Sequence, residues 1–198
     1  MIGTAEYHLA KYLDEFIKPN IPSHYMLNST QMFLNRLKNF IFNQGDKLLS
    51  FDVVSVFTNI PLHETIELIA NYFYSDESKT TPPFSKIIFK KLLLLSTGGL
   101  FMYKDRLFKQ IDGVTMGSPL GPSLANFFLA HIETKLFESD FEYKPRIYMR
   151  YVDDIFVVFS HDCNFELFFN LLNSPHDNIK FTYEEGFDTI PFKILWFT

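Results

Sequence analysis

An acidic pair inside an apolar segment is the strongest chemical signal in this chain of 198 residues. Asp153 and Asp154 follow Tyr151-Val152 and stand between two apolar runs, Ile147–Met149 and Ile155–Phe159. This pattern predicts a β-hairpin with two carboxylates at its tip. Carboxylates are costly to place there unless a bound cation offsets their loss of water. The pair therefore predicts a metal site, although Asp-Asp is also ordinary turn chemistry between two strands.

A third carboxylate, Asp52, lies in the apolar segment Lys47–Val54, which predicts a buried strand followed by a turn at Thr58–Pro61. Two strands that each end in aspartate can bring Asp52 and Asp153 to one site. Magnesium binds oxygen ligands and holds substrate phosphates through one or two carboxylates. Two such ions stabilise the attacking and leaving oxygens of a phosphoryl displacement. These residues predict nucleotidyl transfer with two Mg²⁺ ions, which Mn²⁺ could replace. A capping aspartate at a strand end is the alternative for Asp52.

Three segments together resemble the motifs of reverse transcriptases. Phe51–Pro61 resembles motif A, Gly113–Pro122 resembles motif B and Tyr151–Asp154 resembles motif C, in the order of that family. The Phe-Thr-Asn-Ile-Pro end of motif A and the Met-Gly-Ser-Pro-Leu-Gly-Pro core of motif B most resemble Penelope-like retroelements. The resemblance extends from about Glu6 to Phe192. It implies an RNA-directed DNA polymerase that adds deoxynucleotides to a DNA primer on an RNA template.

The resemblance also implies roles for the acidic residues. Asp52 and Asp153 would bind both catalytic ions, and the backbone carbonyl of Val53 would complete the coordination of one of them. Asp154 resembles an accessory carboxylate with a weaker claim to direct ligation.

Further residues are implied to contact the substrate. Phe57 would close over the sugar and exclude a ribose 2′-hydroxyl, and Gly117 would let the backbone approach a nucleotide closely. Tyr151 would brace the primer terminus, and Lys180 would contact a phosphate. Core packing is the alternative for Phe57, and an exposed strand face is the alternative for Lys180. Met116 stands where many reverse transcriptases carry a motif B glutamine, and we expect packing alone from it.

Composition favours one globular domain. A chain with 47% hydrophobic residues can bury a sizeable core, and we expect its 24 phenylalanines mainly to fill that core. A net charge of −5 argues mildly against a nucleic-acid binder. Three basic clusters moderate that objection, each with an ordinary solvated face as its alternative. They are Lys86, Lys90 and Lys91; Lys104, Arg106 and Lys109; and Lys144, Arg146 and Arg150.

Cysteine usage and hydropathy predict the compartment. The single cysteine, Cys163, excludes an internal disulfide and a Cys-rich zinc site, so we expect an intracellular protein of the nucleus or cytoplasm. No segment reads as a membrane span or a signal peptide.

Sequence periodicity predicts how these motifs are positioned. Helices are expected near residues 5–17, 29–42, 62–74, 84–95, 119–138 and 164–172. Strands are expected at 47–54, in a hairpin over 100–110 with Lys104-Asp105 as its turn, in the acidic hairpin, and at 178–183. This order predicts an α+β fold with helices packed on one face of an antiparallel sheet, as a polymerase palm requires, together with N-terminal helices.

The expected domain is a partial reverse transcriptase domain over residues 1–198. We find no upstream fingers segment and no downstream thumb or GIY-YIG endonuclease, and Pro191–Ile194 departs from an expected Phe-Leu-Asp pattern. Two functional hypotheses follow: a working polymerase, or an inactive retroelement remnant that at most binds nucleic acid or protein. A telomerase-like or intron-encoded polymerase shares the carboxylates, but is expected to carry glutamine in motif B.

Overall fold

The computed structural model describes residues 4–76, 78, 80–115, 117–186 and 192. The expectations for Met116 and for most of Pro191–Ile194 fall outside these residues. The described residues belong to two compact units, one from Met1–Ile21 and Ser55–Leu129, the other from Pro22–Val54 and Ala130–Thr198.

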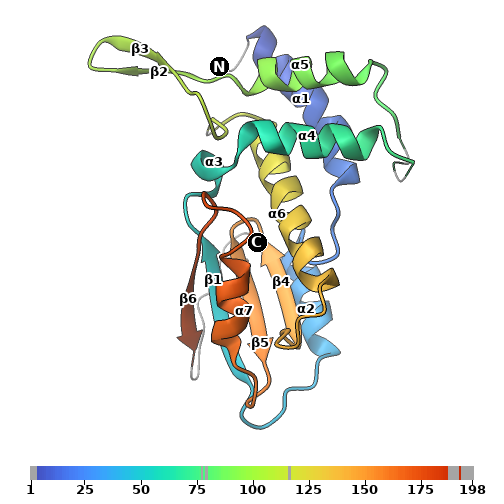
Figure 1. Cartoon of the computed structure of the whole chain (residues 1–198), viewed down its shortest axis with the longest axis vertical. Helices are drawn as coiled ribbons and strands as arrows, with labels where there is room; N and C mark the ends of the chain where they lie inside the picture. The colour runs from blue at the N-terminus through green and yellow to red at the C-terminus, as the bar shows by residue number, and fades with distance from the viewer. Residues whose placement is uncertain (1–3, 77, 79, 116, 187–191, 193–198) are drawn as a thin grey trace. The chain divides into compact units, whose positions relative to one another are not determined.

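The second unit contains a four-stranded antiparallel sheet (Figure 1). Its strands are β1 (Lys47–Val53), β4 (Ile147–Tyr151), β5 (Asp154–Phe159) and β6 (Phe181–Gly186), in the order β4-β5-β1-β6. Every residue of β5 is buried, as expected of an inner strand that is covered on both faces. The sheet therefore places β1 directly beside the acidic hairpin.

Aromatic side chains hold helices against both faces of this sheet. On one face, Phe168 of α7 (Phe165–Leu172) contacts the rings of Phe51 and Phe159. On the other face, Phe33 of α2 (Thr30–Lys38) contacts Phe156. Phe156 and Phe159 point to opposite faces because side chains alternate along a strand. The α+β class is confirmed, and the position of α2 adds a second covered face that the sequence did not predict.

The first unit is mostly helical. It contains α1 (Ala5–Ile17), η1 (Lys18–Asn20), α3 (Val56–Asn59), α4 (Leu62–Phe73) and α5 (Lys86–Thr97). Rings of Phe16, Phe73 and Phe89 join the three long helices. The helix α6 (Gly121–Glu138) begins in this unit, and its residues from Ala130 onward belong to the second.

The first unit also contains a two-stranded hairpin of β2 (Leu100–Tyr103) and β3 (Arg106–Lys109), as predicted. Both turn residues, Lys104 and Asp105, have positive φ, at 47° and 58°. Positive φ at both central residues is the pattern of a type I′ turn.

Several predicted boundaries were wrong, and the largest differences are in α2 and β6. Helix α2 ends at Lys38 rather than Phe42, because Asn39 caps it with a side-chain hydrogen bond to the Asn35 carbonyl. Strand β6 spans Phe181–Gly186 rather than residues 178–183, and the Asn173 side chain accepts the N–H of its first residue, Phe181, at 2.9 Å.

Within the described part of the chain, no helix is long and apolar enough to cross a membrane.

Candidate active site

Asp52 and Asp154 face each other across strands β1 and β5. Their Cα atoms are register partners, and the Val53 N–H donates to the Asp153 carbonyl at 3.1 Å. That bond makes Asp52–Asp154 a non-hydrogen-bonded pair, the kind in which opposing side chains approach most closely. Asp154 is 6% exposed and Asp52 is half-buried. The sheet thus holds two carboxylates on one face, where like charges repel.

Asp153 lies in the two-residue turn between β4 and β5. Its carbonyl accepts from Val53, but the return bond from the Asp153 N–H to the Val53 carbonyl is not formed among the described residues. In a strand the N–H and C=O of one residue point to the same side, so the Val53 carbonyl points toward this turn. Asp153, Asp154, Asp52 and the Val53 carbonyl therefore surround one end of the sheet.

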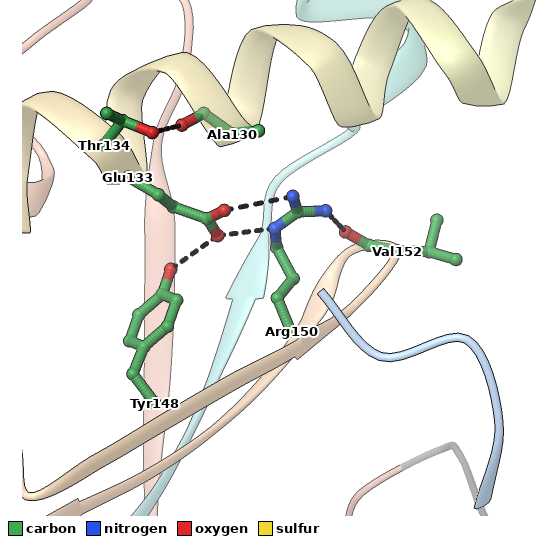
Figure 2. Close-up of polar contacts among 6 residues, drawn as sticks. All are labelled: Ala130, Glu133, Thr134, Tyr148, Arg150 and Val152. Atoms are coloured by element: carbon green, nitrogen blue, oxygen red, sulfur yellow. Dashed lines mark hydrogen bonds and ion pairs between the residues drawn. The ribbon is translucent and has the colours of Figure 1, made fainter. Parts of the chain in front are cut away.

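The first residue of the turn, Val152, has φ +56°. A β-branched side chain rarely adopts this conformation, and such strain persists only where surrounding contacts impose it. One such contact is visible: Arg150 Nη1 donates to the Val152 carbonyl at 3.0 Å (Figure 2).

Arg150 is itself held by a buried ion pair with Glu133 of α6 (Figure 2). Its Nε and Nη2 bind the two carboxylate oxygens at 2.5 and 3.1 Å, a forked arrangement. The Tyr148 hydroxyl donates to the same carboxylate at 3.0 Å. Burial, followed by the charge of Glu133, raises the pKa of Tyr148 well above its usual range.

These contacts correct the interpretation of one basic cluster. Arg150 is fully buried, so it cannot contribute to an exposed nucleic-acid surface. Arg146 pairs with Asp46, and Lys144 donates to the Phe137 and Ser139 carbonyls.

Sequence reasoning also missed Glu133 as a structural partner. The available signal was an acidic residue with apolar residues one helical turn before it, Leu129 and Ala130, and one turn after it, Leu136 and Phe137.

The residues of motifs A and B in the first unit are joined by backbone contacts. Val114 donates to the Phe57 carbonyl at 2.7 Å, and Phe57 is half-buried in α3. Gly113 has φ +72°, and a Cβ there would lie 2.5 Å from the Thr58 carbonyl oxygen. Only glycine fits this close approach.

Gly117 of motif B and the two polar residues just before the motif, Gln110 and Asp112, differ in role. Gly117 has φ +90°, is exposed, and has no heavy atom within 4 Å of where its Cβ would be, so space is open beside it. Asp112 accepts the N–H groups of Leu62 and Gly113, and Gln110 donates to the Asp112 carbonyl. Asp112 and Gln110 thus have the structural role expected of a hairpin end.

Two further predicted residues lie in the second unit. Tyr151 is half-buried, pairs with Asp154, and packs against the core cluster that includes Met149 and Phe156. Lys180 donates from Nζ to backbone carbonyls, and its own carbonyl accepts from Val54 at 2.8 Å.

The donor chemistry at Asp52 and Asp154 suits a hard cation. Carboxylate oxygens are the ligands that Mg²⁺ prefers, and one or two carboxylates are its usual protein share beside substrate phosphates. No group of three or more His, Cys, Asp or Glu side chains that could hold a metal is found in the described ranges. The protein component of the candidate site is therefore the facing pair, with Asp153 in the adjoining turn.

Solved structures with a similar fold include telomerases. Telomerase from Candida tropicalis, in complex with the TWJ fragment of telomeric RNA, matches with a TM-score of 0.65 and 16% identity, over 90% of this chain and 33% of that chain. The apo form from the same organism matches with a TM-score of 0.66 and 16% identity, over 89% of this chain and 35% of that chain. Telomerase from Candida albicans, in complex with the TWJ fragment of telomeric RNA, matches with a TM-score of 0.59 and 12% identity, over 92% of this chain and 36% of that chain. The chain spans about a third of the length of these telomerases.

A family model covers most of the sequence. No curated protein matches the chain. Residues 5–182 match the model described as reverse transcriptase (RNA-dependent DNA polymerase), which confirms the family indicated by the three motifs. The chain belongs to the reverse transcriptase family, whose members are RNA-dependent DNA polymerases.

Proposed function

We propose that this chain catalyses RNA-templated addition of deoxynucleotides to a primer 3′ end, with Mg²⁺ held by Asp52, Asp153 and Asp154. The observation that carries the proposal is the placement of Asp52 opposite Asp154, beside the turn that contains Asp153. In the reaction, the primer 3′ hydroxyl gives its proton to solvent, its oxygen bonds to the α-phosphorus of the nucleotide, and the bond from that phosphorus to the leaving pyrophosphate breaks. The bound ions supply charge stabilisation on the entering and leaving oxygens.

The chain's own groups hold and orient the reactants. The Val53 carbonyl would serve as a further oxygen ligand for Mg²⁺ beside the carboxylates, and the ion would in turn hold the nucleotide phosphates. Tyr151, on the strand that enters the turn, supports the primer terminus. Lys180 contacts a phosphate after its amine leaves the carbonyls of Asn173 and His176.

Two residues of the first unit set nucleotide selection in this proposal. Phe57 stacks beside the sugar and excludes a ribose 2′-hydroxyl, so the product is DNA. Gly117 lets the nucleotide approach the backbone, which its open surroundings support.

The partners follow from the same proposal: an RNA template, a DNA primer and deoxynucleoside triphosphates. Family membership and the RNA-bound telomerases of similar fold support an RNA template. We further propose that residues 1–198 form one reverse transcriptase domain of the Penelope-like type, because the motif A ending Phe57–Pro61 and the motif B core Met116–Pro122 resemble that group.

Primer extension tests this function. The purified chain is incubated with an RNA template, a DNA primer, deoxynucleotides and Mg²⁺, and compared with Asp153→Asn. Asp105→Asn, which changes an exposed aspartate at the other two-residue hairpin turn, is the matched control. We expect extension by the original chain and the control, and none by Asp153→Asn. Absence of extension by the original chain contradicts the proposal and favours an inactive remnant.

A further inference from the structure

The turn that contains the acidic pair is held at two consecutive carbonyls. Arg150 Nη1 donates to the carbonyl of Val152, and the Val53 N–H donates to the carbonyl of Asp153. The Val152 carbonyl belongs to the peptide unit before Asp153 and the Asp153 carbonyl to the unit after it, so these two bonds fix both peptide planes that flank Asp153. Their orientation determines where the Asp153 side chain leaves the backbone.

The backbone of Arg150 is also fixed from outside the sheet. Its N–H donates to the Tyr25 carbonyl at 2.8 Å, and its carbonyl accepts from Leu27 at 2.6 Å. The segment around Met26 thus forms a parallel bridge to β4. Arg150 therefore projects its guanidinium from a strand position that has little freedom.

All three nitrogens of the guanidinium donate hydrogen bonds, to two different partners (Figure 2). Nε and Nη2 bind the Glu133 carboxylate, and Nη1 binds the Val152 carbonyl. Glu133 is 3% exposed and Arg150 is 0% exposed, so both charges are removed from water. A buried ion pair is often no more stabilising than apolar residues of the same volume. Net stability alone therefore does not account for this pair.

We infer that Glu133 and Arg150 are positioning residues, which transfer the rigidity of α6 to the turn and hold the Asp153 and Asp154 carboxylates in place for metal binding. The left-handed Val152 is the conformation that this contact imposes. The inference rests on the proposed function, because the fixed turn contributes to catalysis only if its carboxylates bind metal. The turn contact itself can be tested without any enzymatic activity.

Amide hydrogen exchange at two neighbouring residues measures the contact directly. The Val53 N–H is bonded to the turn at the Asp153 carbonyl, whereas the Val54 N–H is bonded to Lys180 on the β6 side. Loosening of the turn should increase exchange at Val53 and leave Val54 unchanged. The ratio of the two exchange rates therefore separates the turn from general destabilisation of the sheet.

The double variant Glu133→Gln/Arg150→Met removes both buried charges while keeping an acceptor for the Tyr148 hydroxyl. We expect the Val53/Val54 exchange ratio to rise at least about tenfold, about 1.4 kcal/mol of local opening free energy. Thr134→Val is the matched control, because Thr134 bonds only one turn back to the Ala130 carbonyl of the same helix (Figure 2). The control should leave the ratio unchanged.

Arg150→Lys provides a second variant in case the double variant does not fold. An ammonium group keeps the charge opposite Glu133, but it lacks the planar fork that spans the carboxylate and the Val152 carbonyl. We expect the same direction of change in the ratio. An unchanged ratio in each folded variant overturns the inference.

Steady-state kinetics of primer extension test whether the fixed turn contributes to the proposed reaction. In primer extension, we expect kcat to fall at least about tenfold in Arg150→Lys, with KM for the template–primer unchanged. An unchanged kcat overturns the inference, even if the exchange ratio rises. If the original chain extends no primer while the ratio rises in the variants, the fixed turn stands and the proposed function fails.

Discussion

Asp52 on β1 and Asp154 on β5 are cross-strand partners, and the Val53–Asp153 hydrogen bond makes them a non-hydrogen-bonded pair with closely approaching side chains. Like charges in direct opposition destabilise a sheet. A divalent cation held by these carboxylates would remove that penalty and stabilise the fold by mass action.

Magnesium should therefore raise the thermal unfolding midpoint of the chain. At a Mg²⁺ concentration about a hundredfold above Kd, the stabilisation is about 2.7 kcal/mol, and chelation by EDTA should reverse it. Asp52→Asn should lose this response, because it removes one of the two facing carboxylates. Calorimetry with and without Mg²⁺ is the measurement. An equal rise in Asp52→Asn would place the metal elsewhere, and Asp105→Asn should behave like the original chain.

Two glycines near motif B should respond differently to alanine. Gly113→Ala combines positive φ with a Cβ only 2.5 Å from a backbone oxygen, so we expect a loss of about 3 kcal/mol or more in unfolding free energy. Gly117→Ala has positive φ but open space, so we expect a loss of about 1–2 kcal/mol. Urea unfolding measures both. Equal losses would contradict the difference in free space beside the two glycines.

Gly117→Ala should also impair nucleotide use beyond its effect on stability. If the nucleotide approaches the backbone at Gly117, a methyl group should lower kcat/KM for the deoxynucleotide at least about tenfold. Steady-state kinetics below the unfolding temperature provide the value. A kcat/KM within twofold of the original chain, about 0.4 kcal/mol, would remove Gly117 from the substrate-binding residues.

The buried tyrosine should give stability a specific pH dependence. Tyr148→Phe removes a hydrogen bond to the Glu133 carboxylate, which costs about 2 kcal/mol near neutral pH. Burial, then the Glu133 charge, raises the pKa of Tyr148 above its ordinary 10.0. Its contribution is therefore fully present below pH 10 and is lost as pH rises through the folded-state pKa. The difference in unfolding free energy between the two proteins should shrink above about pH 10. A constant difference across that range would contradict the hydrogen-bond assignment.

Phe57→Val should relax sugar discrimination. The smaller side chain leaves room for a 2′-hydroxyl, so the ratio of deoxynucleotide to ribonucleotide kcat/KM should fall at least about tenfold, about 1.4 kcal/mol. Phe42→Val, at a residue that is 47% exposed, is the control. Unchanged discrimination in Phe57→Val would assign that ring to packing alone.

Local patterns in the sequence predicted much of the fold. Two apolar runs on either side of the acidic pair defined the hairpin of β4 and β5, and Lys104-Asp105 defined the other hairpin. Helix α1 begins and ends where periodicity places it, and the structure adds a cap, because the Thr4 side chain accepts the Tyr7 N–H. These features depend on neighbouring residues alone, so they can be predicted from sequence.

Contacts between distant elements could not be predicted in this way. Glu133 and Arg150 lie 17 positions apart, and their contact depends on how α6 is rotated above the sheet. Arg150 consequently resembled a surface charge in the sequence. Packing of α2 on the second sheet face likewise depends on tertiary contacts of Phe33, which helix periodicity does not specify.

The most direct test of the central claim is single-nucleotide incorporation on an RNA template by the original chain, Asp52→Asn and Asp105→Asn. We predict that the original chain and Asp105→Asn incorporate the templated deoxynucleotide at similar rates. Asp52→Asn should be slower by at least about a thousandfold, about 4 kcal/mol of transition-state stabilisation. Incorporation by Asp52→Asn at the rate of the original chain would contradict a catalytic site at the facing carboxylates.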